Sequence, residues 1–156
     1  MNLLFLLLWF ALCADQDARA RRVSNGLSFA GGLIALVYLL INGHGWLGAP
    51  MDQAGWALLL TLAMTLPGYA LNRLGAGDVK VLIAVALASD SLHILGTFIG
   101  AGVTNVIWLL TRQKIAPVMG QRLTRRYPGL LSTTSNKHPF VPFLFLGFAM
   151  TVAFIH

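Results

Sequence analysis

Six apolar runs follow one another in only 156 residues, with short polar segments between them. They are Leu3–Ala14, Leu27–Ile41, Ala54–Leu71, Val79–Ala88, Leu92–Leu110 and Phe140–Ile155. A helix that crosses a bilayer needs about 20 apolar residues, so the runs resemble membrane spans, although several are short. The composition is 57% hydrophobic and 10% charged, whereas a soluble domain carries roughly 25% charged residues. The pattern predicts an all-α polytopic membrane protein with one membrane-embedded domain over residues 1–156.

The basic residues set the orientation of these spans. With six spans, all eleven Lys and Arg residues lie on one side, which the positive-inside rule assigns to the cytoplasm. Joining the fourth and fifth runs into one helix would move the last six cations outside. We therefore predict six spans with both termini on the outer side. This topology accounts for the net charge of +6, and nucleic acid is not expected as a partner. The positive-inside rule also accounts for the basic loop 111–138. Alternatively, this loop would contact anionic headgroups or a partner protein.

Three of the five acidic residues lie at the predicted inner face. Asp15 and Asp17 end the first run, and Asp78 begins the fourth. An ionisable group at the edge of a span is costly, and it is therefore a functional candidate. On one helix Asp15 and Asp17 point about 200° apart, so only one of them can face the bundle interior. Asp52 and Asp90 fall in predicted outer loops, where we expect solvated charges.

Asp78 follows two glycines in the segment Gly75-Ala76-Gly77-Asp78-Val79-Lys80. Gly75 and Gly77 permit positive φ and a close backbone approach that would position the carboxylate. Taken alone, these residues are more typical of a structural loop. They do not form a phosphate-binding loop, because the required Gly-x-x-x-x-Gly-Lys spacing is absent.

Two carboxylates from different helices have a specific chemical use when they meet in a water-accessible pocket. Held close, they share one proton and titrate as a pair. The ionised group can take a proton from an attacking water, while the protonated group polarises a peptide carbonyl. The four histidines show no paired helical spacing, and Cys13 is the single cysteine. We therefore expect neither a metal site nor a cofactor.

Three segments resemble, in order, the motifs of type IV prepilin peptidases, which are Gly-x-Gly-Asp intramembrane aspartic proteases. The segment from Asp17 to Asn25 is similar to the first motif, an Asp followed by a basic stretch and a Pro-Asn pair, with Ser24 in place of the proline. Residues 75–80 resemble the second motif, and residues 139–144 resemble a Pro-rich start of the last helix. The resemblance implies that Asp17, rather than Asp15, forms the catalytic pair with Asp78.

The resemblance also implies the activity, the substrate and the location. Such proteins are multi-pass aspartic endopeptidases of the bacterial inner membrane that face the cytoplasm. Their prepilin-like substrates have a basic leader before an apolar helix. The chain resembles the short form of the tight-adherence or Flp pilus systems, without the segment that methylates the product, so peptidase activity alone is expected. Arg22 and Lys80 either anchor the topology or lower the pKa of one carboxylate, and Asn25 is expected to cap the second helix.

Two other interpretations use the same acidic residues. The chain would be a non-catalytic six-helix scaffold or a small cation transporter if the carboxylates paired with Arg or conducted a cation. A transport path needs polar groups near the midplane, where Thr104 and Asn105 are the main candidates. A protease that cuts within membrane spans also fits Gly-x-Gly-Asp, although the Asp17 motif and the short length favour a leader peptidase.

Overall fold

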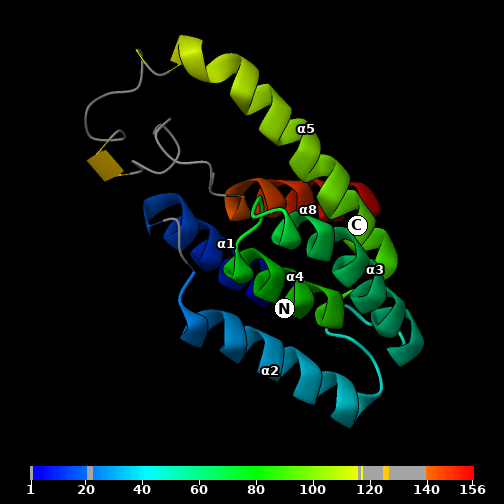
Figure 1. Cartoon of the computed structure of the whole chain (residues 1–156). Helices are drawn as coiled ribbons and strands as arrows, with labels where there is room; N and C mark the ends of the chain where they lie inside the picture. Colours follow the sequence, from blue (N-terminus) through cyan, green and yellow to red (C-terminus); the bar gives the residue numbers. More distant parts are fainter. Residues whose placement is uncertain (1, 21–22, 116, 118–124, 127–139) are drawn as a thin grey trace.

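Six long helices make up most of the described part of the chain (Figure 1). The computed structural model describes residues 2–20, 23–115, 117, 125–126 and 140–156. The helices are α1 (Asn2–Ala20), α2 (Asn25–Asn42), α3 (Met51–Ala70), α4 (Ala76–Ala88), α5 (Ser91–Ile115) and α8 (Val141–Ile155). Within these residues there is no strand, only an isolated bridge between His44 and Pro50. The predicted all-α class is confirmed, and each apolar run corresponds to one helix.

The fourth and fifth runs form separate helices, as the charge distribution predicted. Ser89 ends α4 with an extended backbone, at φ −130° and ψ −158°. The carboxylate of Asp90 then accepts a 2.8 Å hydrogen bond from the backbone N–H of His93, which is the geometry of a helix N-cap. Two polar residues thus break what would otherwise be one long helix.

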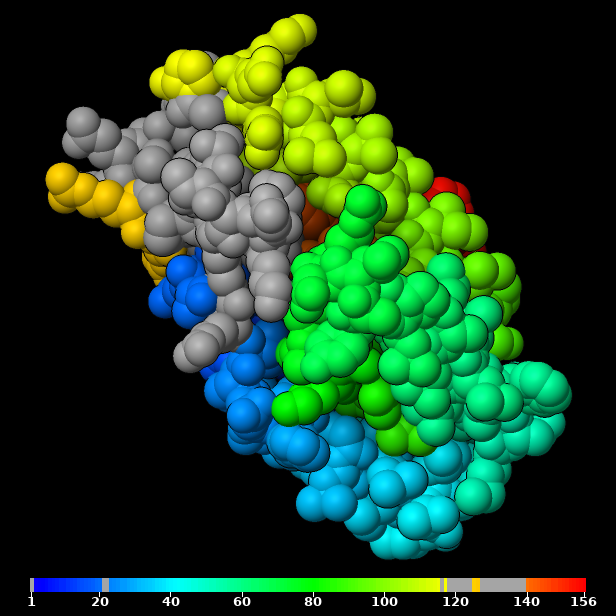
Figure 2. Space-filling view, viewed as in Figure 1, coloured from blue at the N-terminus to red at the C-terminus, as the bar shows by residue number. Residues whose placement is uncertain are grey.

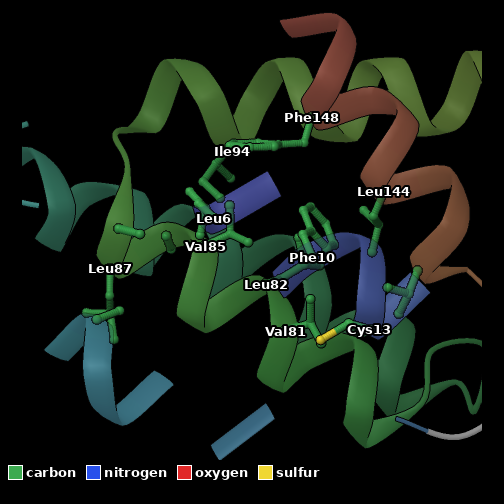
Figure 3. Close-up of a cluster of buried hydrophobic side chains, with 14 of the residues drawn as sticks. Leu6, Phe10, Cys13, Val81, Leu82, Val85, Leu87, Ile94, Leu144 and Phe148 are labelled. Carbon is green, nitrogen blue, oxygen red and sulfur yellow. The ribbon is translucent and has the colours of Figure 1, made fainter. Parts of the chain in front are cut away.

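Helix α4 lies at the centre of the arrangement, between α2 and α3 (Figure 1). Most of its apolar side chains are buried, as expected for a helix that is hydrophobic on most faces. Its 13 residues span only about 20 Å. The core around it contains Phe10, Leu82, Ile94 and Phe148 (Figure 3). Helix α8 packs against α5 and α1.

The outside of the molecule is strongly apolar. Helices α2, α3 and α5 form much of the face seen in Figure 2, and large apolar side chains are exposed on all of them. Ile41 is 77% exposed and Phe154 on α8 is 88% exposed. A soluble monomer rarely exposes apolar patches above a few hundred Å². Two helices, α2 and α5, combine the length and the apolar composition needed to cross a membrane.

Candidate active site

Asp17 ends the buried face of α1. Leu6, Phe10, Cys13 and Asp17 follow one another at helical spacing and are all buried, because this stripe faces the core. The side chain of Asp17 is the polar end of the stripe and only 5% of the residue is exposed.

The carboxylate of Asp17 meets the start of the last helix. Its Oδ2 accepts a 3.1 Å hydrogen bond from the backbone N–H of Val141, the first residue of α8. The N–H groups of a helix's first turn have no partner inside the helix, and a negative charge is favourable there. The start of the last helix therefore places a hydrogen-bond donor against the candidate catalytic residue.

Asp78 lies in the first turn of α4 and is 6% exposed. Its Oδ2 accepts a 3.0 Å hydrogen bond from the backbone N–H of Gly75, the N-cap residue. This is the returning half of a capping box, in which the third helical residue binds the N-cap amide. The Gly-x-Gly-Asp spacing thus starts α4 and fixes one carboxylate oxygen at the same time.

The two glycines do not use the conformational freedom that the sequence suggested. Gly75 has φ −79° and Gly77 lies within α4. Among the described residues, positive φ occurs at Gly43, Gly48 and Asn72. The expectation of positive φ was therefore wrong, because both residues adopt the geometry of an ordinary helix start. Gly77 packs against Val23 without a close approach, because a methyl group on Gly77 would lie 3.5 Å from Cβ of Val23, an ordinary van der Waals distance.

Asn25 and Lys80 join the two motifs directly. Nζ of Lys80 donates a 3.0 Å hydrogen bond to Oδ1 of Asn25 and lies 4.6 Å from the centre of the Phe29 ring. The expected capping role of Asn25 was wrong, because Ser24 caps α2 by accepting a hydrogen bond from Leu27 N. Among the described residues, no ion pair joins Lys80 to a carboxylate.

These contacts bring the end of α1 and the start of α4 to the same end of the bundle. Val23, three residues beyond α1, packs against Gly77, and Asn25 binds Lys80. Deeper in the bundle, Cys13 and Val81 belong to one buried cluster and are drawn together in Figure 3. The two most buried carboxylates of the described chain, one from each helix, therefore flank this junction.

The remaining site predictions have mixed outcomes. Asp15 is partly exposed and pairs with Arg19 at 3.0 Å, in line with its expected place outside the bundle. Asp52 is exposed as expected, but it lies in the first turn of α3 rather than in a loop. Arg22 and most of the basic loop 111–138 lie outside the described residues.

Asp90 is not a simple solvated charge, which corrects the sequence-based expectation. Burial raises the pKa of Asp90, but hydrogen bonds from the backbone and ring of His93, with the charge of that ring, outweigh it and lower the pKa below its usual range. The Asp90 Oδ1 to His93 Nδ1 distance is 2.6 Å. The sequence analysis missed this pair, although the Asp-x-x-His spacing at a helix start was a visible signal.

The described residues contain no group of three His, Cys or acidic side chains that could hold a metal ion. Among the described residues, the two buried carboxylates at the junction of α1 and α4 remain the strongest candidates for catalytic groups. The comparisons with known proteins point the same way, because the sequence model of the type IV leader peptidase family matches residues 4–110. No curated protein and no solved structure matches significantly.

Proposed function

The chain belongs to the type IV leader peptidase family, and from this membership we propose that it is an aspartic endopeptidase of the bacterial inner membrane. Its substrates would be prepilin-like proteins, from which it removes the leader peptide. The match covers α1 to α4 and most of α5. It therefore includes both candidate catalytic residues, Asp17 and Asp78.

The observation that carries this proposal is the burial of Asp17 and Asp78 on two helices that meet at one end of the bundle. In the proposed reaction the ionised carboxylate takes a proton from a water molecule as the water oxygen bonds to the peptide carbon. The protonated carboxylate polarises the carbonyl and then gives its proton to the leaving nitrogen as the C–N bond breaks. One shared proton serves both groups because two adjacent carboxylates do not ionise together easily.

We place this end of the bundle at the cytoplasmic face, with six spans and both termini outside. The cationic residues lie at the same end of the predicted spans, as the positive-inside rule requires for cytoplasmic loops. The apolar exterior and the two long apolar helices support a bilayer around the protein. Helix α4 is short for a span, but its neighbours shield it from lipid.

In this topology the site lies where a substrate's cytoplasmic leader would join its apolar membrane helix. A basic leader before an apolar segment is the substrate class that the family resemblance suggests. The resemblance to the tight-adherence or Flp type further suggests a small pilin, cleaved without methylation of the product.

The test is cleavage of a synthetic leader-helix peptide by the purified protein in nanodiscs. We expect Asp17→Asn and Asp78→Asn each to lower kcat by about 10³-fold or more, since each removes one member of an acid-base pair. Asp52→Asn makes the same chemical change at an exposed position and should cleave as the wild type does. Wild-type cleavage by either candidate variant would reject the assignment. An inactive wild type with carboxylate-dependent cation uptake would favour a transporter instead.

A further inference from the structure

The hydrogen bond between Asp17 and Val141 joins residues 124 positions apart in the chain. The bond is buried, and Val141 itself is completely buried. Helix α8 lies beyond residues 4–110, which the family match covers. A candidate catalytic carboxylate is therefore held by a part of the chain that the match does not include.

The position of α8 along α5 is set by contacts that leave no room for a side chain. A methyl group on Gly100 of α5 would lie 2.6 Å from the Cα of Gly147. A methyl group on Gly147 would lie 2.6 Å from the backbone nitrogen of Ala101 and would also collide with the carbonyl oxygen of Thr97. Fewer than two turns of α8 separate Gly147 from Val141. Because a helix is stiff over this length, the glycine contact fixes where the Val141 amide lies.

The amide in turn restricts the carboxylate. A free Asp side chain rotates about two bonds, but a hydrogen bond to a backbone N–H selects one orientation of its two oxygens. Displacement of a catalytic group by about 1 Å can cost 10²-fold in rate. The contact of α8 with α5 therefore affects the orientation of Asp17 in two steps. The contact sets the position of the Val141 amide, and that amide orients the carboxylate.

We propose that the N-terminal backbone of α8 is a positioning element for Asp17, and that the Gly100–Gly147 contact holds it at the required depth. This proposal rests on the proposed function, because it assigns Asp17 a role in catalysis. Val141 acts through Asp17 and has no contact with the reacting peptide in this scheme. The consequence is that α8 sets kcat, although it contributes no catalytic side chain.

The first test does not depend on activity. In protein labelled with ¹⁵N-valine, the Val141 amide resonance is assigned from its absence in Val141→Ile. We expect this resonance to move with pH as Asp17 ionises, and to stop moving in Asp17→Asn, where the partner no longer titrates. If the Val141 amide resonance changed neither with pH nor in Asp17→Asn, the proposal would be overturned.

The second test changes the position of the amide. We expect Gly147→Ala to lower kcat about 10- to 100-fold with KM within about twofold, because substrate still binds while Asp17 is misplaced. Gly102→Ala is the matched control, since a methyl group there meets nothing within 4 Å. Because Gly147→Ala risks misfolding, a second variant carries the α-hydroxy analogue of valine at position 141. It replaces the N–H by an ester oxygen, keeps the valine side chain, and should lower kcat in the same way.

The outcomes separate the two proposals. A wild-type protein that cleaves no leader peptide would reject the proposed function and leave the amide titration as an independent test of the contact. An active wild type that needs Asp17, but keeps its kcat when the Val141 N–H is removed, would reject the positioning role alone.

Discussion

Nζ of Lys80 and Oδ1 of Asn25 lie 3.0 Å apart, although 55 positions separate the two residues in the chain. Lys80 lies two positions after the candidate catalytic Asp78, and Asn25 is the first residue of α2, the helix that follows Asp17 in the chain. The bond therefore ties the starts of α4 and α2 together beside the site. Lys80 thus binds an amide oxygen, and among the described residues it forms no ion pair with Asp17 or Asp78.

The first prediction concerns this bond. Lys80→Ala and Asn25→Ala should each lower the free energy of unfolding by about 1 kcal/mol, since each removes a hydrogen bond to a charged group near the surface. The double variant should lose little more than either single variant. The thermal midpoints of all four proteins in nanodiscs give the coupling energy. Strictly additive losses would show that the bond contributes nothing.

Ser24 offers a second prediction, because its hydroxyl accepts one hydrogen bond and its backbone N–H donates another. Its Oγ caps α2 at Leu27 N, and its N–H donates to Oε1 of Gln16 at 3.0 Å. Ser24→Ala should lower the thermal midpoint by about 2–4 °C, as expected for loss of an N-cap worth about 1 kcal/mol. Ser24→Pro suits the φ of −61° but removes both bonds, so it should lower the midpoint at least as much. A proline variant more stable than wild type would show that rigidity outweighs the cap.

The third prediction tests the contact between α1 and α2. The Trp9 ring lies directly over Gly31, and its Nε1 donates a 3.1 Å hydrogen bond to the carbonyl of Leu27. Gly31→Ala should displace the ring and cost about 1–3 kcal/mol, the usual range for overpacking. Gly26→Ala lies in the same helix with open space around it and should leave the midpoint unchanged or slightly higher. Equal effects of the two substitutions would contradict the packing.

The fourth prediction follows from the lowered pKa of Asp90. A carboxyl whose pKa is lower in the folded state stabilises that state at pH values above its unfolded pKa. Compared with Asp90→Asn, the wild type should be more stable by about 1 kcal/mol at most near neutral pH, because Asp90 is partly exposed and water screens its charge. The difference should shrink as the pH falls below the ordinary Asp value of 3.8 and on through the lower folded pKa. A difference that stays constant down to the lowest pH at which the protein remains soluble would reject a role for the charge.

Metal removal supplies the fifth prediction. The proposed chemistry uses two carboxylates and a water, so leader cleavage should continue at the same rate after treatment with EDTA and 1,10-phenanthroline. The check is kcat/KM before and after chelation, with a zinc protease as the positive control. Loss of activity that added Zn²⁺ restores would replace the aspartic mechanism with a metal-dependent one.

Several local features could be predicted from the residues themselves. The separation of α4 from α5 follows from Ser89 and Asp90, because a polar pair with N-cap propensity interrupts an apolar run. The place of Asp78 in the first turn of a helix also follows from local rules, because a carboxylate there can bind the N-cap amide. Local rules failed where two residues competed for one role, as when Ser24 rather than Asn25 capped α2.

The long-range features were beyond such rules. Nothing near Asp17 in the chain indicates that its partner is the Val141 amide, and nothing near Lys80 indicates Asn25. Both contacts depend on how the helices are arranged. Many arrangements bury the same apolar stripes, because hydrophobic burial has no direction.

The sequence alone determined the six helices and the side of the membrane at which the acids are expected. Hydrophobic periodicity and the distribution of charge are properties of short stretches, and neither requires knowledge of neighbours in space. Only the tertiary structure decided what each acid touches. Hydrogen bonds are short and directional, so their partners are set only once the packed helices have fixed every backbone position to within a fraction of an ångström.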